Sequence, residues 1–206
     1  TVYFLALGLG LGSLITEVDG IPYVQFVGTG IVASAAMAAA VFPGMFNTYV
    51  RRVFQRTYDA MLAAPVSVGE LVTGEGSWIA AKAGIYGTVP LIVTFFFGLT
   101  PTWGMALVPF IGFLTGLGFA FFGMWVSGVV KTIGETTYVT SAVLTPLFLV
   151  AGTFFPISNL PPWAQVAAQF NPLFHCVQLV RDASFGWQPA ADLYHLAALS
   201  TFAVIM

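Results

Sequence analysis

Long stretches without a charged side chain are the feature that most limits the folds open to this sequence. No Asp, Glu, Lys or Arg occurs in residues 1–16, 20–50, 83–130 or 136–180. Charged residues make up 7% of the 206 residues, against roughly 25% in an average soluble domain. So few charges cannot cover the surface of a water-soluble globule of this size. The chain is therefore expected to be one transmembrane domain, residues 1–206, surrounded by lipid.

The lengths of these stretches predict how often the chain crosses the membrane. A spanning helix needs about 20 largely apolar residues, so the 83–130 stretch is too long for one crossing. Pro101 and Trp103 supply a turn and an interfacial aromatic within it, which predicts a hairpin of two helices. The fold class expected is all-α, a six-transmembrane-helix bundle with helices over residues 1–16, 23–49, 78–98, 104–130, 136–154 and 190–206. Since the sequence begins without Met and ends in an apolar run, we expect it to be a fragment of a longer protein.

The Lys and Arg residues indicate how the bundle is oriented. With six crossings, one set of connections holds five of the six basic residues, and the other holds only Arg181. Basic residues favour the cytoplasmic side of a membrane, so both termini are expected to be cytoplasmic. The five are Arg51, Arg52, Arg56, Lys82 and Lys131.

The inner connection, residues 51–77, carries an apolar stripe. Phe54, Tyr58, Met61 and Leu62 recur at helical spacing, and Pro65 ends the run. The stripe suits either an interfacial helix lying among lipid headgroups or a docking helix for a soluble partner. After it, Ser67 and Glu70 have the spacing of a capping box, which predicts the start of the next helix.

The outer connection, residues 155–189, is rich in Pro but still apolar. Asn171 and Pro172 divide it into two short helices, which suggests a re-entrant pair dipping into the outer leaflet. A set of polar residues in the second helix suits either an outer gate or a polar edge facing water, with Arg181 and Asp182 in ordinary surface pairing. The set is His175, Gln178, Arg181 and Asp182.

Several kinds of chemistry lack their sequence patterns. His175 and His195 have no Cys or acidic cluster at ligand spacing, so no metal site is expected, and no catalytic motif is found. No complete phosphate-binding loop occurs, so any ATP that powers this protein would be bound by another chain or domain. The net charge of −2 offers no basic field for nucleic acid. Two glycine pairs, Gly8 with Gly12 and Gly112 with Gly116, have the spacing of closely packed membrane helices.

Both connections carry motifs that resemble one family. Residues 56–71 contain Arg-Thr, then Met-Leu-Ala-Ala-Pro-Val-Ser and Gly-Glu-Leu, and the outer segment contains Asn-Leu-Pro-Pro-Trp, Asn-Pro-Leu-Phe-His and Leu-Val-Arg. In this order, within six apolar helices, they resemble the membrane subunit of type-2 ABC exporters, the ABC-2 permease family. The branch that exports drugs and lipo-oligosaccharides is the most similar.

This resemblance implies a permease of a prokaryotic inner or plasma membrane that dimerises with a second copy or a sister permease. Two ABC ATPase subunits would bind ATP and Mg, and this chain would bind no cofactor. The family's N-terminal cytoplasmic helix is expected to lie outside this sequence. The inner loop would couple to the ATPase through Phe54, Tyr58, Met61, Leu62, Ser67 and Glu70. The second and fifth helices would line the substrate path with Thr29, Ser34, Phe42, Phe46, Asn47, Thr140, Ser141, Thr145 and Phe148.

Two function classes follow from the residues and the resemblance. The first is an ATP-driven permease that moves an amphipathic drug, lipid or lipo-oligosaccharide by alternating access, as in multidrug efflux. The alternative is an integral membrane enzyme acting on lipid at the outer interface through His175, Arg181 and Asp182. A passive channel is disfavoured because the sequence has no ring of charge or repeated filter pattern.

Overall fold

The computed structural model describes residues 6, 10, 12, 15–18 and 20–206 of the chain. Most of the expected first helix, and with it Gly8, lies outside the described residues. The described part is mostly helical, and its only sheet is a small antiparallel pair formed by β1 (Glu17–Val18) and β2 (Ile21–Pro22).

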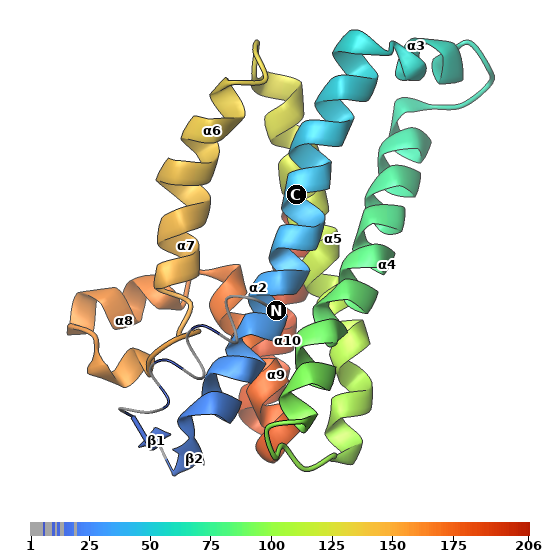
Figure 1. Ribbon diagram of the computed structural model, residues 1–206. Helices are drawn as coiled ribbons and strands as arrows, with labels where there is room; N and C mark the ends of the chain where they lie inside the picture. Colours follow the sequence, from blue (N-terminus) through green and yellow to red (C-terminus); the bar gives the residue numbers. More distant parts are fainter. Residues whose placement is uncertain (1–5, 7–9, 11, 13–14, 19) are drawn as a thin grey trace.

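Three helices are long and apolar enough to cross a membrane among the residues described. The first is α2 (Tyr23–Phe42), which continues through two π-helical segments, Pro43–Asn47 and Val50–Phe54, as one 32-residue rod. The others are α4 (Val68–Phe95) and α5 (Val108–Val129), which a 3₁₀ turn at Trp103–Leu107 precedes. They pack side by side (Figure 1). The protein is therefore an integral membrane protein by length and composition of its helices.

The other helices are shorter. The short α3 (Thr57–Leu62) lies between the α2 rod and α4. After α5, three segments follow one another as a single interrupted rod: α6 (Glu135–Val139), a π-helical segment (Thr140–Leu144) and α7 (Thr145–Leu149). Then come α8 (Pro162–Ala168), α9 (Pro172–Phe185) and α10 (Pro189–Ile205). None of these reaches the length of a complete crossing, so the count of six spans stays a prediction.

The element boundaries follow local sequence signals. The hairpin expected in residues 83–130 is confirmed, with Gly98 in the left-handed region (φ +87°) at the turn between α4 and α5. α4 begins at Val68, as the capping box of Ser67 and Glu70 predicts, and it runs without a break through most of the helix expected over residues 78–98. The α6–α7 rod ends at Leu149 rather than at residue 154, shortly before Gly152 turns the chain at φ +77°.

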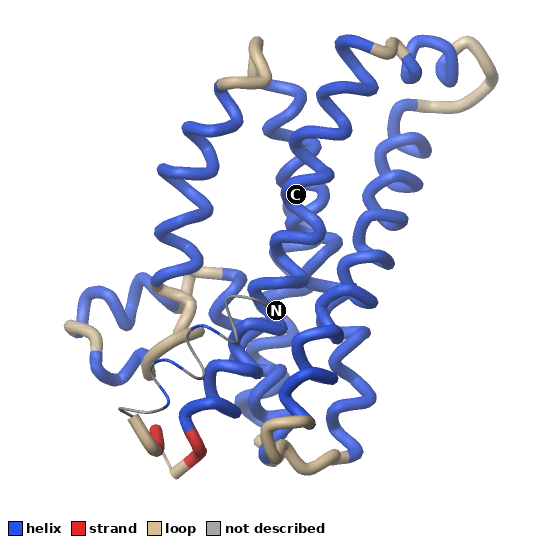
Figure 2. The backbone as a smooth tube through the Cα atoms, in the orientation of Figure 1, coloured by secondary structure: helices blue, strands red, loops and turns tan. Residues whose placement is uncertain are grey.

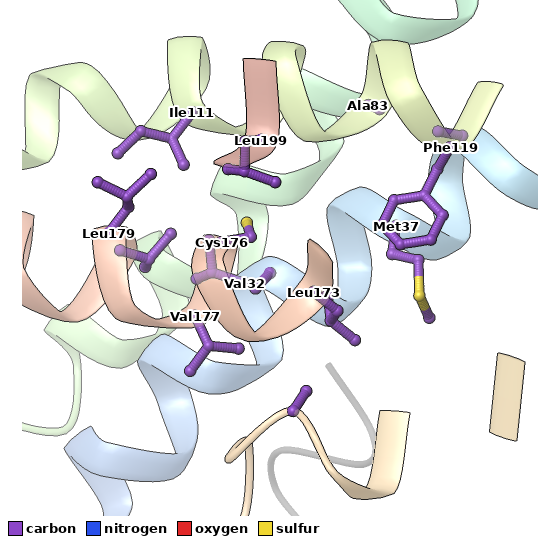
Figure 3. Packing of buried hydrophobic residues seen from close by; sticks show 14 of the residues in the cluster. Val32, Met37, Ala83, Ile111, Phe119, Leu173, Cys176, Val177, Leu179 and Leu199 are labelled. Carbon is purple, nitrogen blue, oxygen red and sulfur yellow. The ribbon is translucent and has the colours of Figure 1, made fainter. Parts of the chain in front are cut away.

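Buried side chains from five helices meet in one core. Figure 3 shows Met37 of α2 beside Phe119 of α5, and Val32 of α2 beside Cys176 of α9, with Leu199 of α10 close by. Small residues bring the helices together: a Cβ added to Gly116 would lie 2.7 Å from the Cβ of Ala83. The close packing predicted for Gly112 and Gly116 is confirmed, since both lie against α4.

The two long connections lie at opposite ends of the bundle. α3 and the turn between α5 and α6 are at one end, and the β1–β2 hairpin and α8 lie toward the other (Figure 1). Figure 2 shows the loops gathered at these ends, with the helices running between them. Residues 51–77 and α8 therefore lie toward opposite ends of the helices, while α9, which belongs to the same segment as α8, packs in the core.

Candidate functional site: a cavity between two interrupted helices

A cavity of about 350 Å³ lies between α2 and the α6–α7 rod. Five of the nine residues predicted for the substrate path line it, and these come from segments about a hundred positions apart in the sequence. They are Ser34, Phe42, Thr140, Thr145 and Phe148, joined in the lining by Met37, Ala38 and Leu144.

Both walls of the cavity contain a helix irregularity next to a proline. Pro43 begins the π-helical segment of the α2 rod, and Pro146 follows the π-helical segment 140–144. A proline has no N–H for the i−4 carbonyl, which loosens the regular ladder. The Thr145 hydroxyl donates to the Thr140 carbonyl, five residues back, at 3.0 Å. Such π-helical turns occur frequently at functional sites.

The lining is apolar and aromatic, with a few hydroxyl groups and no charged side chain. The Phe42 ring stacks on Phe46 with centroids 6.2 Å apart, and the Phe148 ring meets Phe154 edge to face at 5.1 Å. The Ser34 hydroxyl donates to the Gly30 carbonyl at 3.2 Å. A lining of this kind suits the apolar part of an amphipathic molecule.

The remaining residues predicted for the path lie elsewhere around these helices. Thr29 is fully buried, and its hydroxyl donates to the Phe26 carbonyl of its own helix at 2.9 Å. Phe46 is absent from the lining and stacks on Phe42, which belongs to it. Asn47 and Ser141 are exposed.

The segment predicted to dock a partner is broken where a continuous stripe was expected. Arg56 has left-handed backbone dihedrals (φ +50°) and separates Phe54 from α3. The prediction of one helix carrying Phe54 and Leu62 is therefore wrong. The apolar side chains are nevertheless exposed at this end, with Phe54 66%, Met61 46% and Leu62 39% exposed.

Other contacts refine this end of the molecule. Ser67 and Glu70 form the predicted capping box, in which the Glu70 Oε2 accepts from the Ser67 amide at 2.8 Å. Exposed Val66 and Val68 on either side of the cap extend the apolar surface. Neither valine was predicted as part of this surface, although the sequence places both directly beside the capping residue Ser67. We call Phe54, Met61, Leu62, Val66 and Val68 the inner apolar surface.

The four residues predicted for an outer gate divide into two places. Gln178, Arg181 and Asp182 line a cavity of about 560 Å³ at the end with β2. The Arg181 Nη2 donates to the Gly152 carbonyl at 2.6 Å, and its guanidinium carbon lies 3.6 Å from the centre of the Phe26 ring. Because Arg181 is 8% exposed and His175 3%, the interpretation as a polar edge facing water is wrong for both.

His175 belongs to a separate cluster between α9 and α10. Its Nδ1 lies 2.7 Å from the Nδ1 of His195, and its Nε2 donates to the Gln169 carbonyl at 2.8 Å. Among the residues that the structure describes, no group of three or more His, Cys, Asp or Glu side chains suits a metal ion.

Long apolar helices, three of them able to cross a membrane among the residues described, mark this chain as an integral membrane protein. It belongs to the ABC-2 type transporter family, whose model matches residues 1–185. The family is that of transport permease subunits.

Individual relatives agree with this assignment. Nodulation protein J of Rhizobium leguminosarum bv. viciae is 34% identical over 205 residues, which cover 99% of this chain and 79% of that protein. Nodulation protein J of Rhizobium meliloti (strain 1021) is also 34% identical, over 99% of this chain and 78% of that protein. The inner membrane transport permease YadH of Escherichia coli K12 is 26% identical over 90% of this chain and 72% of its own length.

Proposed function

We propose that this chain is the membrane subunit of an ATP-driven exporter in a prokaryotic inner membrane. It crosses the membrane six times, with both termini and the inner apolar surface in the cytoplasm. Arg51 lies at the end of the α2 rod and Lys131 in the α5–α6 turn, whereas Arg181 lies in α9. The end of the α2 rod and the α5–α6 turn are at one end of the bundle and α9 lies toward the other (Figure 1), which supports this orientation. A matching permease from Escherichia coli that carries "inner membrane" in its name supports the location.

The inner apolar surface docks the ATPase in this proposal. A cluster of exposed apolar side chains beside Arg51 and Arg56 suits a protein partner as well as lipid headgroups, and membership of an ABC transporter family favours the partner. Two ATPase subunits, which bind ATP and Mg, would serve a pair of permease chains, either two copies of this chain or one with a sister permease.

The cavity between α2 and the α6–α7 rod receives the cargo and carries this proposal. An amphipathic drug, lipid or lipo-oligosaccharide fits its apolar walls and its few hydroxyls. The π-helical segments on both walls are places where the helices bend at low cost. Movement of one wall against the other would open the cavity first to the inside and then to the outside.

Bulky substitutions on one wall test this role. Thr140→Trp fills the cavity, whereas Val143→Trp, three residues on, lies outside its lining. We expect the first variant to lower ATP-dependent uptake of a rhodamine dye into inverted vesicles by about tenfold and the second to leave uptake nearly unchanged. Equal uptake by the two variants would contradict the assignment.

The alternative, a lipid-modifying enzyme at the outer interface, finds less support. His175 faces His195 and Gln169, while Arg181 and Asp182 line a different cavity, so the three side chains do not converge on one point. Retained dye transport in a folded His175→Phe variant would count further against it.

A further inference from the structure

One carboxylate joins three segments at the inner end of the bundle. Glu75, in the second turn of α4, accepts from the Arg51 Nη1 at 3.0 Å through its Oε1. Its Oε2 accepts from the Tyr58 hydroxyl of α3. Both oxygens of one side chain are therefore bonded, one to the end of the α2 rod and the other to α3.

These bonds lie in a partly shielded place. The Glu75 side chain is 10% exposed, although that of Arg51 is 45% exposed. Burial, followed by the bond to Glu75, raises the pKa of Tyr58, so its phenol remains a proton donor at neutral pH. A hydrogen bond to a charged carboxylate is stronger than one between neutral groups, and partial burial protects it from water.

The same part of the α2 rod also reaches the other helices. The Tyr49 hydroxyl donates to the Lys131 carbonyl in the α5–α6 turn at 2.8 Å. Arg52 donates through Nη2 to the carbonyl of Ser127, in the last turn of α5, where carbonyl groups lack partners within the helix. The α5–α6 turn leads directly into the rod that forms one wall of the cavity.

Together these contacts make a continuous path from α3 to both cavity walls. The path runs from Tyr58 through Glu75 and Arg51 to the α2 rod, which forms the first wall. It then runs through Tyr49 to Lys131, just before the second wall begins. Phe54, which is exposed beside Tyr49 at a ring distance of 5.9 Å, connects this path to the inner apolar surface.

We propose that Tyr58, Arg51 and Glu75 form a clasp that transmits movement of α3 to the walls of the cavity. This inference depends on the proposed function, in which α3 is pushed by an ATPase. Glu75 is a positioning residue: it is absent from the lining of the cavity between α2 and the α6–α7 rod. It shares a groove with Met61 and Val66 of the inner apolar surface, where it acts by holding α3, α2 and α4 together. Without the clasp, α3 would move alone and the cavity would not respond.

The experiment uses the permease purified with its co-expressed ATPase in lipid nanodiscs. Every variant carries Thr145→Cys in the cavity as a reporter, labelled by a charged maleimide; the native Cys176 is buried and serves as the unreactive background. The measurement is the ratio of labelling rates with and without ATP plus vanadate. With the clasp intact, we expect this ratio to differ from one by about fivefold or more.

Two conservative variants remove the clasp. Tyr58→Phe deletes one hydroxyl and Glu75→Gln deletes one charge, while Asp59→Asn, an exposed carboxyl on α3, is the matched control. We expect both clasp variants to retain the ATPase and its hydrolysis, but to lose most of the nucleotide-dependent change in labelling. The control should behave like the parent.

Three results would overturn the inference. An unchanged labelling ratio in both clasp variants would show that the cavity responds without the clasp. Loss of the ATPase from the purified complex would place Tyr58 and Glu75 in docking instead. An equal loss of response in Asp59→Asn would show a general effect of charge. A different result would contradict the proposed function itself: the parent protein, with an intact clasp, would purify without an ATPase.

Discussion

The Nδ1 atoms of His175 and His195 lie 2.7 Å apart and join α9 to α10 inside the bundle. Since the His175 Nε2 donates to the Gln169 carbonyl, the Nδ1 of a neutral His175 can only accept, and His195 must donate to it. This pair fixes the tautomer of each ring and links α9 to the helix that follows.

Replacing one histidine should therefore destabilise the bundle. His175→Phe keeps an aromatic ring of slightly larger size but leaves the His195 Nδ1–H and the Gln169 carbonyl without their partner, which costs about 1–3 kcal/mol. Thermal unfolding in detergent measures this cost. The double variant with His195→Phe should lose less than the sum of the single losses, and strict additivity would show that the two rings do not interact.

Crowding of α5 against α2 leads to a second prediction. A Cβ added at Gly123 would lie 2.7 Å from the Val41 carbonyl oxygen and 3.0 Å from the Gly44 Cα, so Gly123→Ala must push the two helices apart. We expect a loss of about 1–3 kcal/mol, measured by thermal unfolding. Gly128→Ala on the same helix has open space and should be neutral or gain up to about 1 kcal/mol.

Asp182, in the cavity at the end with β2, should make stability depend on pH. Burial and a hydrogen bond with Asp192 raise the pKa of Asp182 in α9 to about 7 from its ordinary value near 3.8. A carboxyl whose pKa is raised by folding contributes fully below its unfolded value and loses that contribution as the pH rises through its folded value.

The contribution of Asp182 to the melting temperature should therefore fall between pH 4 and pH 7, the window set by its two pKa values. Asp182→Asn should flatten this part of the pH profile, whereas Asp59→Asn, at an exposed position, should keep the wild-type shape. A wild-type profile in Asp182→Asn would assign the pH dependence to another group.

The capping box at the start of α4 gives a local prediction. Ser67→Ala removes the oxygen that accepts from the Glu70 amide and should destabilise the first turn of α4 by about 1 kcal/mol. Hydrogen exchange at the Glu70 amide should become faster, while exchange farther along α4 should not change. Ser77→Ala, an exposed serine within the same helix, should leave the first turn unaffected.

The outcome of the sequence predictions depended on how local each signal was. The hairpin near Pro101, the capping box at Ser67 and the break before Pro172 were all predicted correctly, because each depends on a few neighbouring residues. The continuous stripe from Phe54 to Leu62 was not, because periodicity does not reveal that Arg56 leaves the helical region. Neither the Tyr58–Glu75 bond nor the His175–His195 pair has any sequence signature.

The sequence alone determined that this is a membrane protein, because its charge-free stretches exclude a water-soluble surface. The motifs in its loops indicated the family. Only the tertiary structure decided which polar groups meet. The packing of helices that are far apart in the chain decides which side chains are buried. It also decides which groups bond to Glu75 and why His175 and Arg181 lie in separate places. This packing depends on contacts between the faces of different helices. The sequence pattern of one helix does not specify which face of another helix it will contact.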